Sequence, residues 1–465
     1  MPEKSGNIKN QKKKELEKNS KAPEKRRQEK MKSGSSYKAE NKEKEKNEKP
    51  AVKDGAGDFA ARAVSFPLFV PLMTIAGFML CSAVCYICGY SIFSPSFGVD
   101  GLFHCLYIGD FSIGLSSRLL VGSVLSLFSD TVTADMIDIF AKVFLYLSFV
   151  LQSLLSACII KKGLRDKNIF LTLLAVLFVM NPVSVCTYAR YFGVLDLFFY
   201  VVFLFAVIIQ IKGRSTLQFF VAALSIAGLL IHYAYFLAFF PSLFVLGLYR
   251  TVNAEKKDSL KEAAALGVHS VLSTGMFFYL TVFAKNCLIM TSDEMLAYVN
   301  SKADKSLFIY GDYLNYYLYD IFRGEQIYDT GSSLSALVNI NMELVKPDVC
   351  IKYLLLTAPL FVLYYAVCVL LIKGAKGKKR LPFIAMAAMP LALVPELILS
   401  SDSLRWITST VLCLFTVMFA LILMKAPEAE ELTEKFTKLK KPLRLSVYVL
   451  TAVYMLLCLI LPRFI

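Results

Sequence analysis

The segments LTLLAVLFVM at residues 171–180 and FYVVFLFAVII at residues 199–209 are almost wholly apolar, and neither alternates between apolar and polar residues. Apolar runs of roughly 18 to 20 residues are long enough to cross a bilayer as a helix. A transmembrane barrel would instead contain segments of about ten residues with alternating polarity. With 56% hydrophobic residues and a mean hydropathy of +0.56 over 465 residues, the chain is predicted to be an all-α, polytopic membrane protein.

Eleven apolar segments are predicted to span the membrane. They lie near residues 66–92, 136–160, 169–187, 192–211, 216–231, 233–249, 264–286, 351–372, 382–399, 406–424 and 445–462. The pair 216–231 and 233–249 has an alternative interpretation as one broken helix. Two spans are favoured because the basic loop that follows then lies on the same side as the other basic loops.

Charge sets the expected orientation. Lysine and arginine gather in residues 1–62 and after every second span, which places the N-terminus in the cytoplasm and the C-terminus outside. The predicted outer loops contain no Asn-x-Ser/Thr acceptor, which favours the cytoplasmic membrane of a bacterium. Because the net charge of +15 is explained by these topology signals, no nucleic-acid partner is predicted.

Residues 1–62 form a separate tail before the transmembrane domain at 63–465. The tail is rich in lysine and glutamate and poor in large apolar residues, so we predict that it is disordered. It either attracts anionic membrane lipid at the inner leaflet or is a solvated leader that fixes orientation.

Two long loops are predicted on the outer face, near residues 94–135 and 287–350. The first contains the apolar stretch LLVGSVLSLF at residues 119–128, which predicts an interfacial or re-entrant helix. The second is polar, and Cys287 and Cys350 bracket it, so a disulfide is compatible with an oxidising outer compartment.

The first outer loop holds residue types that suit transfer chemistry. Asp110 lies in YIGDFS at residues 107–112, and Arg118 follows eight residues later. A carboxylate there can bind a divalent cation or accept a proton from a hydroxyl nucleophile, and a guanidinium can hold a phosphate with two parallel hydrogen bonds. Alternatively, Asp110 caps a helix and Arg118 anchors it at the headgroups. Asp100 is the second candidate carboxylate, although Asp-Gly is also typical of a turn.

Further polar residues lie at predicted outer ends of spans. Arg190 and Asp196 flank the start of the fourth span, and an ionised Asp in hydrocarbon costs roughly 2.5 to 3.5 kcal/mol, so Asp196 needs a partner or a wet cavity. His232, between the fifth and sixth spans, suits acid–base catalysis or phosphate binding, or a structural place in the aromatic belt. Arg405 precedes Trp406, the single tryptophan, and is either an interface anchor or another guanidinium on the same face.

No motif predicts a metal centre or a bound nucleotide. Cys81, Cys85 and Cys88 share a helix face, but no matching pair follows elsewhere. The chain has no Walker loop, no dinucleotide fingerprint and no GxSxG elbow, so ATP-driven transport and hydrolase chemistry lack support. The one cofactor that the sequence suggests is a divalent cation, which an outer carboxylate can bind.

Several short motifs together resemble those of bacterial multipass proteins related to the GT-C class of membrane glycosyltransferases. They are GD at residues 109–110, SRLLVG at 117–122, IHY at 231–233, FP at 240–241 and DSLRW at 402–406. The resemblance implies a many-helix fold whose active site, at the outer face, takes a sugar from a polyprenyl phosphate in cell-surface glycan assembly.

The resemblance also implies roles for particular residues. An acidic residue of the first outer loop acts in catalysis in that class, which matches Asp110 or Asp100 here. Basic residues hold the lipid phosphate, which matches Arg118, Arg190 or Arg405. The chain lacks the adjacent acidic pair that is common in that loop and a large C-terminal outer domain.

Three functions therefore stand as hypotheses. The first is a glycosyltransferase-like enzyme that acts on a lipid-linked sugar at the outer leaflet. The second is a transporter or flippase of a lipid-linked glycan, for which polar residues near the bilayer midplane are few. The third is a non-catalytic membrane assembly subunit.

Overall fold

The computed structural model describes residues 64–284, 292–307, 347–399 and 403–460. Within these ranges the chain forms helices and turns, and the β pairing is limited to one isolated bridge between Val132 and Ala303. All of these residues belong to the unit 63–465.

The described ranges contain two groups of helices along the chain. The first group is α4 (Phe69–Ile87), η1 (Gly101–Tyr107), η2 (Phe111–Ile113), α5 (Leu120–Leu125), α6 (Ala134–Arg165), α7 (Ile169–Met180), α8 (Pro182–Arg190), α9 (Asp196–Lys212), η3 (Ser215–Gln218), α10 (Phe219–Ile231), α11 (Tyr235–Ala238) and α12 (Phe240–Asn253). The second is α13 (Lys256–Phe278), η4 (Tyr279–Phe283), α14 (Ser292–Lys302), α17 (Pro347–Gly374), η6 (Gly377–Arg380), α18 (Leu381–Ala388), η7 (Met389–Leu393), α19 (Val394–Leu399), α20 (Ser403–Leu423), α21 (Pro427–Thr437) and α22 (Lys441–Ile460).

Seven helical segments in the described ranges are long and apolar enough to cross a membrane. They are Phe69–Ile87, Ala134–Arg165, Ile169–Arg190, Lys256–Phe283, Leu354–Gly374, Leu404–Leu423 and Lys441–Ile460. The other segments predicted as spans form shorter helices, such as α9 with 17 residues, α12 with 14 and α18 with 8. The helical membrane class is therefore confirmed, and the number of eleven spans stays a prediction.

The chain turns back at His232. This residue adopts an extended conformation, with φ −161° and ψ 128°, and ends α10. Near the far end of α12, Arg250 donates hydrogen bonds to the backbone oxygens of Gln210 and Gly213, which lie at the end of α9 just before η3 and α10 begin. The start of α10 and the end of α12 are therefore close together, so residues 217–248 form an antiparallel pair and not one broken helix.

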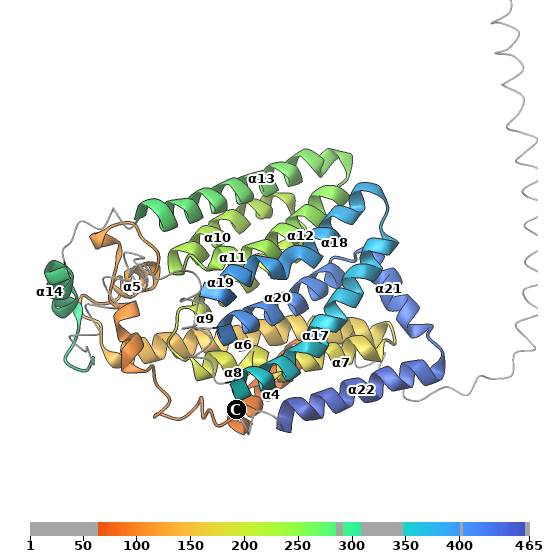
Figure 1. The fold of residues 1–465 in the computed structure, drawn as a ribbon, viewed down its shortest axis with the longest axis horizontal. Helices are drawn as coiled ribbons and strands as arrows, with labels where there is room; N and C mark the ends of the chain where they lie inside the picture. The colour runs from red at the N-terminus through yellow and green to blue at the C-terminus, as the bar shows by residue number, and fades with distance from the viewer. Residues whose placement is uncertain (1–63, 285–291, 308–346, 400–402, 461–465) are drawn as a thin grey trace, which may run out of the picture. The chain divides into compact units, whose positions relative to one another are not determined.

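The basic loops gather at one end of the bundle. Lys162 at the end of α6 forms an ion pair of 3.1 Å with Glu430 of α21. Arg250 joins the ends of α9 and α12, and the ring of Tyr249 beside it lies 5.9 Å from that of Phe383 in α18. In Figure 1, α21 lies at this end, whereas α5 and α14 lie at the opposite end. The elements of the two predicted outer loops are thus separated from the basic loops by the length of the helices.

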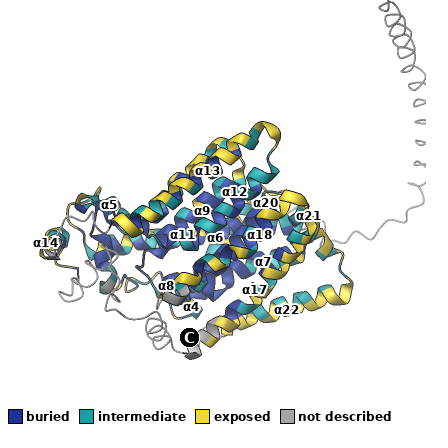
Figure 2. Cartoon of the chain, turned by 45° about the horizontal axis from the view of Figure 1, so that its top comes forward, coloured by how far each residue is buried: buried dark blue, intermediate teal, exposed yellow. Residues whose placement is uncertain are grey.

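Burial is graded from the centre to the periphery. The central helix α9 is mostly buried, with Phe199, Tyr200 and Phe203 at 0% exposure. Helices α13 and α22 carry exposed faces along their length (Figure 2), and these faces include apolar side chains such as Val271 and Leu450. Exposed apolar helix faces suit contact with lipid.

The turn at His232 depends on a close contact at Gly228. A Cβ atom at this position would lie 2.6 Å from ring carbons of Tyr235. We expect Gly228→Ala to lower stability by about 1–3 kcal/mol, since the buried ring has to move. Thermal unfolding in detergent measures the change.

Gly275→Ala is the matched control, because a Cβ there meets nothing within 4 Å on the exposed face of α13. We expect it to be neutral or slightly stabilising, since Ala is the better helix former by about 1 kcal/mol. Equal destabilisation by both variants would contradict the close contact at Gly228.

Candidate functional site

The loop at 94–135, predicted to be outer, is attached to the end of α10 by hydrogen bonds from two adjacent residues. The Arg118 N–H donates to the Leu230 carbonyl at 2.9 Å. The Ser117 hydroxyl donates to the Leu229 carbonyl at 3.3 Å and accepts from the Tyr233 N–H at 2.9 Å. Arg118 has φ +70°, a conformation that costs a non-glycine residue roughly 1–2 kcal/mol. The loop therefore holds Arg118 in a strained but fixed position.

Arg118 meets His232 directly. Its Nη2 lies 3.1 Å from Nε2 of His232, and its guanidinium lies 5.6 Å from the ring centroid of Tyr233. The Ala234 N–H donates to the other ring nitrogen, Nδ1, at 3.1 Å. Burial of His232, together with the charges of Arg118 and Arg405, lowers its pKa, so the imidazole is neutral at physiological pH. A neutral imidazole has one acceptor nitrogen, yet donors face both, so this place is rich in donors.

A second pair lies beside the first. Arg405, in the first turn of α20, donates from Nε and Nη2 to the two carboxylate oxygens of Asp196, each at 2.6 Å. Asp196 is 1% exposed and begins α9, where the positive end of the helix dipole favours its charge. The ring of the adjacent Trp406 lies 6.4 Å from that of His232. Asp196 thus has the partner that its burial requires.

The two pairs form one electrostatic cluster. Burial has the largest effect on the pKa of Arg118 and lowers it. The next largest influence is Tyr233, which raises the pKa, followed by the charge of Arg405, which lowers it. The carboxylates of Asp196 and Glu396 also raise it. Four segments contribute: the loop at 94–135, the end of α10, the start of α9, and α19 with α20. We call Arg118, His232, Asp196 and Arg405 the guanidinium cluster.

Asp110 lies outside the guanidinium cluster. Its carboxylate accepts from Lys302 Nζ at 2.8 Å and from the Ser112 N–H at 2.8 Å, so it caps η2 and pairs with α14. Burial raises the pKa of Asp110, but these hydrogen bonds outweigh burial and lower it to about 2. The Val132 N–H also donates to the Lys302 carbonyl at 2.8 Å. Asp110 therefore joins the two loops that are predicted to be outer.

Asp100 lies in a separate turn of the first loop. The Asp138 carboxylate of α6 accepts from the Val99 N–H at 2.6 Å, which fixes this turn, and Asp100 itself is exposed. Burial lowers the pKa of His104, while Asp138 and Asp100 raise it. Val99 packs against Gly193, three residues before α9 begins. Asp100 is thus an accessible carboxylate on a turn next to the start of α9.

Arg190 is not part of the cluster. It is exposed, and its guanidinium lies 5.6 Å from the ring centroid of its neighbour Tyr191. Conversely, sequence reasoning missed the roles of Lys302 and Asp138. Lys302 lies 192 residues after Asp110 in a polar loop without a motif, whereas the position of Asp138 in the first turn of an apolar span was a usable signal.

No group of three or more His, Cys, Asp or Glu side chains able to hold a metal ion occurs in the part of the chain that the structure describes. Cys287 and the side chain of Cys350 lie outside the described residues, so the predicted disulfide stays a prediction. Comparisons with known protein families, curated proteins and solved structures gave no match to this chain.

The Asp110–Lys302 ion pair predicts a pH-dependent stability. Since the folded-state pKa of Asp110 is about 2 against an ordinary 3.8, the contribution is complete at neutral pH and is lost as the pH falls from about 4 through about 2. We expect Lys302→Met to destabilise by roughly 1–2 kcal/mol at pH 7 and by clearly less near pH 3. Thermal unfolding at both pH values measures this.

Lys305→Met serves as its control, because Lys305 is exposed and lies in the same segment. This variant should leave the unfolding temperature nearly unchanged at either pH. A destabilisation by Lys302→Met that is identical at pH 7 and pH 3 would rule out the ion pair as its cause.

Proposed function

We propose that this protein is a GT-C-like membrane glycosyltransferase that acts on a polyprenyl-phosphate-linked sugar at the outer face of the bacterial cytoplasmic membrane. The observation that carries the proposal is the meeting of Arg118, His232 and Arg405 from three distant segments. Guanidinium groups held in place are suited to the charge of a phosphate leaving group.

The proposal includes a topology of eleven spans with the N-terminus inside and the C-terminus outside. Its support is that the basic loops gather at one end of the bundle and the guanidinium cluster lies away from them. Because lysine-rich loops stay in the cytoplasm, the cluster then faces the outer leaflet. The basic tail at residues 1–62 would contact inner-leaflet lipid.

The proposed reaction is a displacement at the anomeric carbon. The acceptor hydroxyl oxygen forms the new glycosidic bond as the bond from that carbon to the phosphate oxygen breaks. A carboxylate takes the hydroxyl proton, and the electron pair leaves with the lipid phosphate. Arg118 and Arg405 stabilise the charge that develops on this phosphate, and the hydrogen bonds of residues 117–118 to the end of α10 hold Arg118 in place.

Asp100 is the better candidate for the base. Asp110, with a pKa of about 2, is a weak proton acceptor and is already engaged by Lys302. Asp100 is exposed on a turn whose backbone is fixed by Asp138. An accessible carboxylate is better placed to receive a proton from an incoming hydroxyl.

A transporter or flippase of a lipid-linked glycan is the alternative. It is favoured by the break between α7 and α8 at Asn181 and Pro182, where Asn181 is buried and its amide donates to the hydroxyl of Tyr454. Broken helices with buried polar groups are typical of transport sites. A non-catalytic assembly subunit is the third function.

Removal of the guanidinium cluster tests the proposal. We expect Arg118→Ala to reduce glycan transfer by about 10²–10³-fold, as does the loss of one preorganised donor to a developing anion. Transfer is measured in membranes of a deletion strain that carries the variant, with its lipid-linked precursors analysed in parallel. Arg405→Ala is less informative, since it also leaves Asp196 buried without its partner.

Lys305→Ala, an exposed outer charge, is the matched control and should keep full transfer. Transferase loss truncates the lipid-linked sugar, whereas flippase loss makes the complete precursor accumulate inside. Unchanged transfer in correctly inserted Arg118→Ala protein would refute the assignment.

The choice of base gives a separate prediction. Asp100→Asn removes the proton acceptor and should abolish transfer at every pH tested, while Asp110→Asn should act mainly by weakening the contact with α14. Transfer and unfolding temperature are measured together in both variants. The reverse pattern, with Asp110→Asn inactive but stable and Asp100→Asn active, would assign the base to Asp110.

A further inference from the structure

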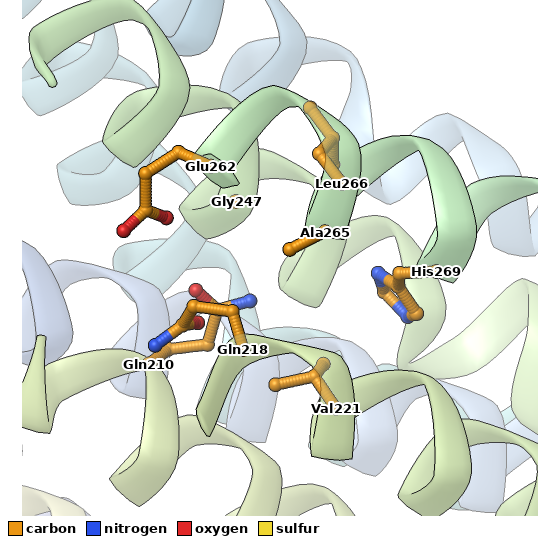
Figure 3. A pocket seen from close by; sticks show the side chains of 8 residues that line it. All are labelled: Gln210, Gln218, Val221, Gly247, Glu262, Ala265, Leu266 and His269. Atoms are coloured by element: carbon orange, nitrogen blue, oxygen red, sulfur yellow. The ribbon is translucent and has the colours of Figure 1, made fainter. Parts of the chain in front are cut away.

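A small polar cavity lies among α9, η3, α10, α12 and α13, close to the basic loops and far from the guanidinium cluster. It measures about 10 Å³. Figure 3 shows its lining, with Glu262 on one side, His269 on the other and the amides of Gln210 and Gln218 between them. Gln210 and Gln218 are 3% and 4% exposed, so both side chains are shielded from bulk water.

Most polar groups around the cavity already have partners. The Glu262 carboxylate accepts from Arg250 Nε at 3.0 Å and from the Ser215 hydroxyl at 2.7 Å. The Nε2 of His269 lies 2.8 Å from the Ser225 hydroxyl. The contacts with Arg250 and Ser215 neutralise the Glu262 carboxylate and engage both of its oxygens as acceptors.

The two amide oxygens are the exception. Oε1 of Gln210 and Oε1 of Gln218 are buried without a hydrogen-bond partner among the described residues. Their orientation is set by the opposite amide atoms, since Nε2 of Gln218 donates to the Ile209 carbonyl at 3.2 Å and Nε2 of Gln210 to the Leu243 carbonyl at 3.4 Å. Turning either amide over would place oxygen against oxygen. A buried acceptor left unpaired costs roughly 1–3 kcal/mol.

We propose that this cavity binds one structural water molecule, which donates its two hydrogens to Oε1 of Gln210 and Oε1 of Gln218. A cavity of about 10 Å³ is close to the smallest that holds a water. Two acceptors match the two donors of water. A bare cation is disfavoured, because it needs more oxygen ligands than two amides supply and the carboxylate of Glu262 is already neutralised by Arg250.

The site is independent of the proposed function and can be tested on the full-length protein. In a structure that resolves ordered water, we expect density at about 2.7–3.2 Å from both amide oxygens. A soak of the crystals in Tl⁺ tests whether a monovalent cation occupies the cavity instead of water. An empty cavity, or an anomalous Tl⁺ peak at this position, would overturn the proposal.

A double-mutant cycle gives a test in solution. Gln210→Met and Gln218→Met each remove one end of the bridge and should lower the unfolding temperature. The double variant should lose less than the sum, because both changes remove the same water. If the oxygens are instead simply unpaired, the two replacements remove nothing in common, so strict additivity would contradict the bridge.

Gln152 provides the matched control. Its amide is satisfied by the protein at both ends, since Nε2 donates to the Phe178 carbonyl at 2.8 Å and Oε1 accepts from the Tyr200 hydroxyl at 3.3 Å. Gln152→Met should destabilise the protein and should combine additively with Gln210→Met. Coupling between these two distant sites would show that the non-additivity is not specific to the cavity.

Discussion

The bidentate contact between Asp196 and Arg405 is the constraint on which the site end of this protein depends. A carboxylate that is 1% exposed cannot remain ionised without a partner, and the first turn of α20 supplies one. The contact fixes α20 against the start of α9. Around the start of α9, the Gly193 carbonyl accepts a hydrogen bond from the Tyr107 hydroxyl, and Phe199 packs near His232. The start of α9 is therefore the point where segments distant in the sequence come together.

The sequence predicted that Asp196 needs a partner but did not identify it. Arg190 is six residues away and is the natural choice, whereas Arg405 is 209 residues away. The turn between α8 and α9 decides between them, because Gly193 adopts φ +107° and the chain changes direction there. The exposed Arg190 is left facing outward. The backbone conformation at Gly193 thus decides which arginine pairs with Asp196, although Arg190 is nearer in the sequence. The periodicity of the sequence does not predict this choice.

The apolar pattern predicted the helices well and their interruptions less well. Each predicted span contains helix in the described residues, since an apolar run in lipid has to satisfy its own backbone hydrogen bonds. The segment at 382–399 is divided into α18, η7 and α19, in line with Pro390 and Pro395, whose missing N–H groups break the helical hydrogen bonds. The ion pair of Asp110 with Lys302 had no counterpart in the pattern, because a polar loop carries no periodicity that reports its contacts.

The fixed backbone conformation of Arg118 supports the proposed function more strongly than the charge of its guanidinium does. A non-glycine residue at φ +70° persists where its surroundings hold it, and here three hydrogen bonds between residues 117–118 and 229–233 do so. Next to it, Arg118 and the Ala234 N–H face the two nitrogens of the neutral His232 imidazole. In the proposed transferase, a phosphate oxygen would accept hydrogen bonds from the guanidinium groups of this cluster. In the proposed transferase, the strain therefore belongs to a site organised in advance for the leaving group, as catalysis by electrostatic stabilisation requires.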